Sequence, residues 1–400
     1  MAAAATVASA LLASSAVAEP APDGLPAFYA TPDKLPTKPG TLIKSEKVKA
    51  PDVDGTVYRV MYVSENQQSK PAAVTGVVVI PETKAPKGGF PVVTWAHGTD
   101  GMADTCAASL EPEEAAPAAN ELLAQGWAIT ASDYEGEGTP GLHPYIAGKN
   151  AARNAIDIVR AAKQLKGADL SDQYVVWGHS QGGHTAMHAS QLAPDYAPEL
   201  DLKGTVAGAP PSQFNLLYNF LKTSDFRYYL LMASGGLNAA YGDKDAPLDE
   251  VLTPAGEKLL PELDKVCASE LRDKFGATDF DTVTKTDPFT VPKWKKILTA
   301  EDPQNFARGS EDPVLIIHGG ADEQIPTASS ALLFDQLCAV DQNLERWVYP
   351  GQKHADVITP SLPDMIHWIG DRFAANGRET TTDPYAPTGQ PDVEVTRCPS

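Results

Sequence analysis

One serine in this sequence is placed for nucleophilic chemistry. The segment Gly178-His-Ser-Gln-Gly182 follows the apolar run Tyr174–Trp177 and precedes a predicted helix over residues 181–193. In a G-x-S-x-G turn between a strand and a helix, the serine stands on a sharp bend and the glycines leave room for it. The amino end of the helix then faces the charge that develops on an attacked carbonyl. We therefore predict that Ser180 is a nucleophile; the alternative is a Gly/Ser turn without chemistry.

A serine hydroxyl needs a base, and the base needs a carboxylate that orients it. Where a G-x-S-x-G turn carries the nucleophile, the acid and then the histidine follow it along the chain. Asp322 follows the apolar run Val314–Ile317 through a glycine turn, and His354 follows the last apolar run, Arg346–Tyr349. We predict that Asp322 is the orienting acid and that His354 is the base.

Four neighbouring groups compete for these two roles. Glu323 stands next to the predicted acid, and Asp312 precedes the strand and therefore sits at its wrong end. His318 lies at a strand end where it could line the site, but it precedes the acid in the chain. His367 lies within the terminal helix, where packing or surface exposure accounts for it.

Two backbone N–H groups are needed to bind the oxyanion of a tetrahedral intermediate. One is that of Gln181, directly after the nucleophile. The other belongs to the loop that follows the run Pro91–Ala96, and this loop begins His97-Gly98. We predict that Thr99 or Asp100 gives the second donor, and the spacing does not choose between them.

The elements that must position these residues alternate between strand and helix. Strands are predicted at 58–63, 74–80, 91–96, 127–131, 174–177, 205–207, 314–317 and 346–349, and helices at 113–125, 149–165, 181–193, 327–339 and 362–373. The first two strands are expected to be antiparallel, while the wholly apolar later strands favour a mostly parallel sheet covered on both faces. The expected fold class is therefore α/β, and specifically an α/β-hydrolase fold.

The chain divides into four expected parts. Residues 1–18 read as a signal peptide, 19–210 and 301–400 as the two parts of the α/β core, and 211–300 as an inserted helical cap. The insertion lacks the strand–helix alternation and is rich in aromatic and leucine side chains. These side chains are expected either to line a substrate pocket or to form the core of the cap itself.

Charge and composition limit the partners. The chain has 400 residues and a formal net charge of -20, which opposes binding to nucleic acid and to anionic membranes. The apolar amino terminus ends in Ala16-Val-Ala18 before Glu19, which is typical of a secretory cleavage site. No later segment is long and apolar enough to predict stable membrane insertion. We expect a secreted protein, with its oligomeric state open.

The four cysteines, Cys106, Cys267, Cys338 and Cys398, suggest two disulfides in an exported chain. Three pairings are possible. The cysteines lack zinc-ligand spacing, so no metal site is expected, and nothing in the sequence implies an organic cofactor.

Three segments together resemble a known family. The segments Trp95–Gly101, Ser132–Tyr145 and Trp177–His184 are similar to the secretory lipase family, the bacterial and fungal group that includes the Candida antarctica lipase A type. The resemblance spans roughly residues 25–398 and implies a lipase or carboxylesterase with a helical cap before the acid-bearing strand. It also implies the pairings Cys106–Cys267 and Cys338–Cys398, and it places the acid and the base on Asp322 and His354.

The sequence therefore predicts a serine esterase or lipase that acts on a small-molecule or lipid ester. A serine amidase or peptidase, an acyltransferase and a binding protein that kept the fold are the alternatives, because a fold does not fix the bond that is cleaved. The acyl-chain length is not legible from these residues.

Overall fold

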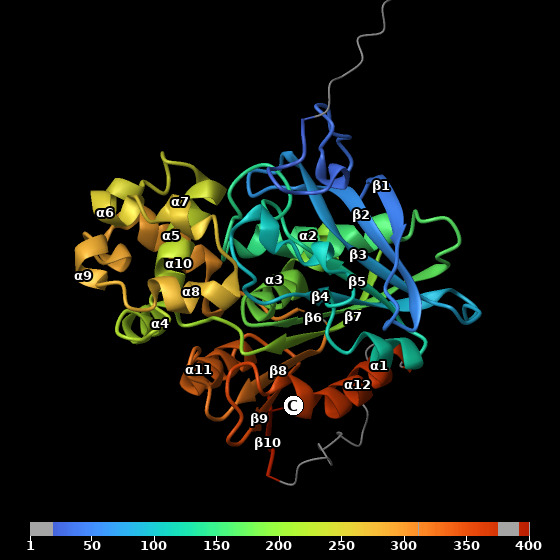
Figure 1. Cartoon of the computed structure of the whole chain (residues 1–400). Coiled ribbons are helices and arrows are strands. Elements are labelled where there is room, and N and C mark those ends of the chain that lie inside the picture. Colours follow the sequence, from blue (N-terminus) through green and yellow to red (C-terminus); the bar gives the residue numbers. More distant parts are fainter. Residues whose placement is uncertain (1–18, 311, 375–391, 400) are drawn as a thin grey trace, which may run out of the picture.

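The computed structural model describes residues 19–310, 312–374 and 392–399. Its centre is a sheet whose ten strands, within these residues, run in the order β1-β2-β3-β5-β4-β6-β7-β8-β9-β10 (Figure 1). The strands are β1 (Leu42–Val48), β2 (Gly55–Glu65), β3 (Pro71–Pro81), β4 (Phe90–Ala96), β5 (Ala128–Ser132), β6 (Leu170–His179), β7 (Asp201–Gly208), β8 (Val314–Gly319), β9 (Leu344–Tyr349) and β10 (Glu394–Arg397). The six strands that are adjacent in the sheet as β5-β4-β6-β7-β8-β9 are parallel, whereas β1–β3 and β10 pair antiparallel with their neighbours.

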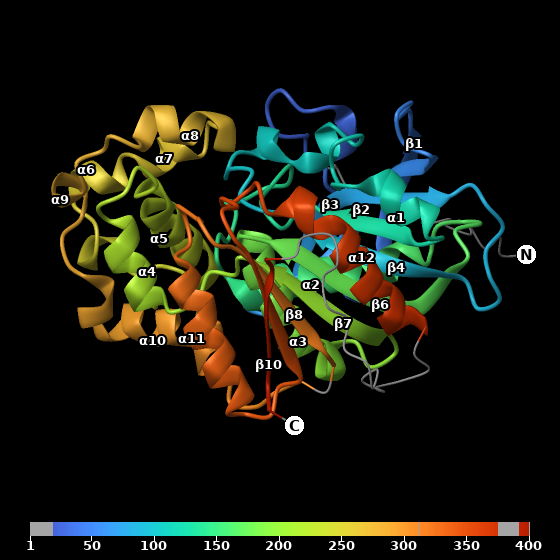
Figure 2. The same ribbon diagram turned by 90° about the horizontal axis from the view of Figure 1, so that it is seen from below.

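Helices cover both faces of the sheet, as the apolar strands require. One face packs against α2 (Gly148–Ala162), α3 (Gln181–Tyr196) and α11 (Thr327–Cys338). The other face packs against α1 (Ala119–Ala124) and α12 (Ile358–Ala374), which lies along the sheet in Figure 2. The chain therefore has the three layers of an α/β-hydrolase fold, as predicted.

A group of helices between β7 and β8 forms a separate unit at one side of the sheet, in yellow and orange in Figure 1. We call residues 211–301 the cap. Its α-helices are α4 (Phe214–Leu221), α5 (Tyr228–Tyr241), α6 (Pro254–Glu257), α7 (Leu260–Leu263), α8 (Ala268–Phe275), α9 (Phe280–Val283) and α10 (Pro292–Glu301). The cap has a hydrophobic cluster of its own, which also reaches Met102, Tyr145 and Ile325 of the core. The insertion is mostly helical, as expected.

Short 3-10 helices complete the secondary structure. They are η1 (Ala27–Tyr29), η2 (Asp104–Cys106), η3 (Ala108–Leu110), η4 (Leu248–Glu250), η5 (Pro288–Thr290) and η6 (Pro303–Asn305). Among the described residues, no helix combines the length and apolar character that crossing a membrane requires. The predicted signal peptide, residues 1–18, lies outside the described residues.

Three expectations about elements were incomplete or wrong. The helix predicted over 113–125 begins only at Ala119, because Pro117 disfavours a helical backbone at Ala116 and Ala118 has a left-handed backbone (φ 56°). The edge strand β1 was not predicted, since its central residues, Lys44–Lys47, are polar and face water along much of their length. The edge strand β10 was also missed; it pairs with β9 near the end of the chain.

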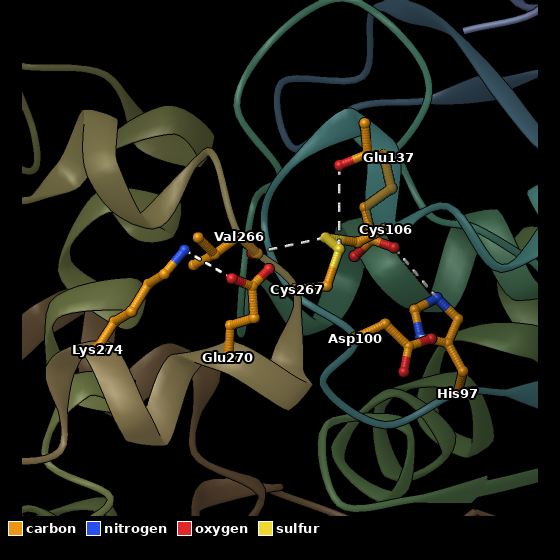
Figure 3. Close-up of a disulfide and its surroundings, with 9 residues drawn as sticks. His97, Asp100, Cys106, Glu137, Val266, Cys267, Glu270 and Lys274 are labelled. Atoms are coloured by element: carbon orange, nitrogen blue, oxygen red, sulfur yellow. Dashed lines mark hydrogen bonds and ion pairs between the residues drawn. A yellow bond between two sulfur atoms is a disulfide. The ribbon is translucent and has the colours of Figure 1, made fainter. Parts of the chain in front are cut away.

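Two disulfides join the four cysteines. Cys106 pairs with Cys267 and Cys338 pairs with Cys398, with Cα atoms 5.4 and 5.3 Å apart, so the pairing implied by the family resemblance is confirmed. The first disulfide links the loop after β4 to the cap (Figure 3). The second holds β10 and the end of α11 together.

Candidate active site

Ser180 stands at the bend between β6 and α3. Its backbone angles are φ 58° and ψ −121°, a conformation that costs a non-glycine residue energy and that persists only when its surroundings impose it. Its N–H donates to the Gly208 carbonyl at 2.8 Å, and its own carbonyl accepts from the His184 N–H at 3.0 Å. The bend is therefore fixed on both sides.

The glycines around this bend are required by close backbone packing. A Cβ atom on Gly182 would lie 1.8 Å from the Ala96 carbonyl oxygen, and one on Gly178 would lie 2.1 Å from that of Gly182. A Cβ atom on Gly183 would lie 2.3 Å from the Gly208 oxygen. The glycine-rich motif thus lets α3 start directly against the ends of β4 and β7.

Asp322 and His354 meet beside this bend. Asp322 follows β8 and His354 follows β9, and the His354 Nδ1 atom lies 2.7 Å from Asp322 Oδ2. His354 is 4% exposed, and its ring centre lies 4.8 Å from that of His179, the residue before Ser180. The loops after three different strands thus bring the predicted nucleophile, acid and base to one end of the sheet.

The Asp322 carboxylate is saturated with donors. Its Oδ1 atom accepts from the backbone N–H groups of Gln324 and Ile325, at 2.9 and 2.8 Å. Burial alone would raise its pKa, but the hydrogen bonds from His318 and His354 outweigh burial and hold the pKa well below its ordinary value. Asp322 is therefore an anion throughout the physiological pH range.

The competing groups take other positions. Glu323 accepts from the His354 backbone N–H at 3.2 Å and so supports the loop rather than the imidazole. Asp312 precedes β8, at the strand end opposite Asp322. The side chain of His367 is about half exposed on α12 and lies 3.8 Å from Asp371.

The loop after β4 runs past the nucleophile. A Cβ atom on Gly98 would lie 3.8 Å from the Ser180 Cβ atom. The hydroxyls of Thr99 and Tyr145 lie 2.8 Å apart. A carboxylate oxygen of Asp100 lies 2.9 Å from His97 Nδ1. Thr99 and Asp100 therefore both remain candidates for the second oxyanion donor.

A hydrogen bond to His143 holds the side chain of Gln181 in place. The amide of Gln181 donates to His143 Nε2 at 2.7 Å, and His143 Nδ1 donates to the Glu135 carbonyl at 2.9 Å. Burial lowers the pKa of His143 to about 4, which keeps it neutral and able to accept this hydrogen bond. Sequence reasoning missed His143 and Tyr145; both lie at the end of the glycine-rich segment that carries the family resemblance.

Glu137 lies fully buried behind the loop after β4 (Figure 3). Its carboxylate is 3.7 Å from His97 Nε2 and 3.6 Å from His143 Nε2. Burial raises the pKa of Glu137, since water does not solvate its charge. Burial alone would lower the pKa of His97, but the charges of Asp100 and Glu137 raise it. His97 thus lies between Asp100 of this loop and the buried Glu137.

A cavity opens from Ser180 into the cap. Besides Ser180 it is walled mainly by apolar and aromatic side chains of α4, α5 and α10 and of neighbouring loops, including Phe214, Leu217, Leu221, Tyr229, Leu298 and Ile325. Several of these residues also belong to the hydrophobic cluster of the cap. Both expectations for the cap's apolar residues therefore hold, because single side chains serve the cavity and the core together.

One group in the described chain has the composition of a metal site. The ligand atoms of His184, His188 and Glu301 lie within 4.8 Å of one another. Both imidazole Nε2 atoms, however, contact the Glu301 backbone oxygen, at 2.7 and 3.0 Å. The Glu301 carboxylate accepts hydrogen bonds from the Gly148 N–H and the Tyr241 hydroxyl. These contacts fasten the end of the cap to α3, and a metal would have to break them.

Comparisons with known proteins identify the family. The family model described as "Secretory lipase" matches residues 115–382. The chain belongs to the secretory lipase family. It is accordingly a carboxylic ester hydrolase, as predicted.

Curated relatives within this family are distant but match over most of their length. Lipase A of Moesziomyces aphidis is 25% identical over 375 residues, which cover 86% of this chain and 79% of the relative. A protein of Mycobacterium tuberculosis described as a probable inactive lipase is 24% identical over 357 residues, covering 84% of this chain and 79% of that protein.

Solved structures agree on the fold. Candida antarctica lipase A in its closed state has a TM-score of 0.77 at 23% identity, covering 90% of this chain and 88% of that one. The cell wall degrading esterase LipA of Xanthomonas oryzae has a TM-score of 0.69 at 18% identity, covering 84% and 98%. At these identities the likeness concerns the fold alone.

Proposed function

We propose that this secretory lipase family member is a secreted serine esterase or lipase in which Ser180, His354 and Asp322 form the catalytic triad. The observation that carries the proposal is the hydrogen bond between His354 and Asp322 beside a strained serine that opens into an apolar cavity. A cavity of this character suits an ester with an aliphatic or aromatic moiety. Secretion is supported by the family and by relatives described as secreted triacylglycerol lipases of Malassezia globosa.

In the proposed mechanism, the Ser180 hydroxyl attacks the ester carbonyl while His354 Nε2 accepts its proton. Asp322 fixes the His354 tautomer with the proton on Nδ1 and stabilises the imidazolium that forms. The N–H groups of Gln181 and of Thr99 or Asp100 bind the oxyanion. His354 then protonates the leaving alcohol, and a water molecule, deprotonated by His354, hydrolyses the acyl-enzyme.

The direct test is hydrolysis of p-nitrophenyl esters from acetate to palmitate by the wild-type protein and by Ser180→Ala. We expect wild-type turnover and a loss in the variant of about 10⁴-fold or more. The chain length with the highest kcat/KM separates a short-ester carboxylesterase from a lipase. A Ser180→Ala variant that keeps substantial turnover would refute the proposed mechanism.

One relative is described as a probable inactive lipase, so an active and a silent triad have to be told apart by experiment. Here the serine, acid and histidine are all present, and the acid and histidine are hydrogen-bonded. Labelling with a fluorophosphonate distinguishes the two, since the reagent modifies only an activated serine. Labelling of wild type but not of Ser180→Ala supports the enzyme, and no labelling supports the silent protein.

Acyl transfer and amide hydrolysis begin from the same acyl-enzyme chemistry. Product analysis with an added alcohol acceptor detects the first, and p-nitroanilide substrates detect the second.

A further inference from the structure

We propose that His318 is a positioning residue for the reaction, a second imidazole that holds the Asp322 carboxylate from the side opposite His354. This inference rests on the proposed triad and adds a member to it. The side chain of His318 lies near the end of β8 and is fully buried. Its Nε2 atom is 3.2 Å from Asp322 Oδ2, the same oxygen that contacts His354.

The surroundings of His318 determine which of its nitrogens carries the proton. Nε2 faces only acceptors, namely the Asp322 carboxylate and the Ile325 carbonyl oxygen at 3.0 Å. Nδ1 faces the Ser330 hydroxyl at 2.8 Å, a group that donates as well as accepts. The tautomer protonated on Nε2 therefore satisfies every contact, whereas the other tautomer would set a lone pair against two acceptors.

The Ser330 hydroxyl is itself held in place. Arg346 Nε, on β9, donates to Ser330 Oγ at 2.9 Å. The Ser330 proton has two acceptors within reach, His318 Nδ1 at 2.8 Å and the Thr327 carbonyl oxygen at 3.1 Å; since Arg346 Nη2 already donates to that carbonyl, we assign the proton to His318. A continuous chain of hydrogen bonds thus runs from Arg346 through Ser330, His318 and Asp322 to His354.

This arrangement gives His318 a specific effect on the proposed reaction. By donating to Asp322 Oδ2 it fixes the carboxylate plane and takes up part of the negative charge that would otherwise act on His354. Without this donor, the carboxylate is fixed on one side only and holds the His354 imidazole less precisely. Proton transfer in the transition state is then slower, so kcat falls. His318 does not line the cavity, so KM should change little.

The test compares His318→Leu with His318→Gln. The leucine variant has no donor, whereas a glutamine amide reaches the position of the imidazole Nε2 and restores one. We expect the leucine variant to lose about 10- to 100-fold in kcat, as when partners that orient a reacting group are removed, with KM little changed. The glutamine variant should recover most of the lost kcat.

Further measurements keep the outcomes separate. Ser330→Ala removes the hydroxyl beside His318 Nδ1 and should lower kcat by less than the leucine variant does, with KM again little changed, which tests the proposal even if the leucine variant does not fold. Wild-type protein that a fluorophosphonate does not label at Ser180 overturns the proposed function and this inference with it. Wild type that is labelled, beside an unchanged kcat in the folded donor-deficient variants or a glutamine variant no better than leucine, overturns this inference alone.

Discussion

Replacing Asp322 by asparagine is the sharpest perturbation of the proposed triad, because it changes charge and donor pattern without changing shape. The Oδ1 position accepts from two backbone N–H groups, those of Gln324 and Ile325. The amide oxygen of the introduced asparagine must therefore take this position, and its NH₂ group must face His318 and His354. A donor facing His354 Nδ1 forces the imidazole proton onto Nε2. The Nε2 atom can then no longer accept the proton of Ser180.

The same tautomer change in a serine protease triad lowers kcat by about 10⁴-fold, which corresponds to about 5.5 kcal/mol of transition-state stabilisation. We expect a loss of this size for Asp322→Asn in steady-state hydrolysis of p-nitrophenyl butyrate, with KM changed little. The control is Glu323→Gln, which alters only the contact to the His354 backbone and should cost less than about tenfold. An Asp322→Asn protein that keeps more than about a tenth of wild-type kcat would show that the acid has been misassigned.

Three further predictions follow from other parts of the structure. Gly182→Ala should abolish folding or activity, because its Cβ atom would lie 1.8 Å from the Ala96 oxygen. Gly370→Ala is the control: its Cβ atom would have no neighbour nearer than 3.8 Å, so its Tm should stay close to that of the wild type. Equal Tm values for the two variants would contradict this. Burial raises the pKa of Asp104 from 3.8 to about 6. Its favourable contribution to the free energy of unfolding is therefore fully present below its pKa in the unfolded chain and is lost as the pH rises through its pKa in the folded protein. Asp104→Asn should therefore raise Tm relative to wild type near about pH 8 but not near about pH 3.5, and a difference independent of pH would disprove the assignment. Ala233 lines the cavity, so Ala233→Trp should lower kcat/KM for long esters relative to short esters by about tenfold. This corresponds to the loss of buried surface from about two methylene groups of the substrate, at about 0.8 kcal/mol each. An unchanged dependence of kcat/KM on chain length would place the acyl group elsewhere.

The sequence was most informative where chemistry and backbone geometry coincide. The role of Gly178 and Gly182 could be predicted from the sequence because the bend around Ser180 admits no side chain at those positions. The central strands could be predicted as wholly apolar runs because both faces of a parallel sheet are buried. For the same reason the edge strand Leu42–Val48 was not predicted: water solvates one side of it, so its residues need not be apolar.

Contacts between distant segments are what the sequence could not supply. The role proposed for His318 depends on Ser330, which belongs to the following helix, and on Arg346, which belongs to the next strand. No local pattern brings these three residues together. The disulfide pairing likewise came from the family resemblance, because cysteine spacing alone left three possibilities open.

The disulfide between Cys106 and Cys267 has a consequence for engineering. In the described chain, the cap is joined covalently to the core at three places: the two points where the chain enters and leaves it, and this cross-link (Figure 3). Next to the cross-link, the Ala268 N–H donates to the Asp100 carbonyl at 2.7 Å. The loop that carries Thr99 and Asp100 is thus attached to the inserted helices as firmly as to its own strand. A graft that exchanges residues 211–301 for the cap of a relative therefore has to present a cysteine to Cys106 and a backbone N–H to the Asp100 carbonyl. The smallest transferable unit of substrate specificity is therefore the cap together with residues 97–106, two stretches of chain that must be exchanged as one.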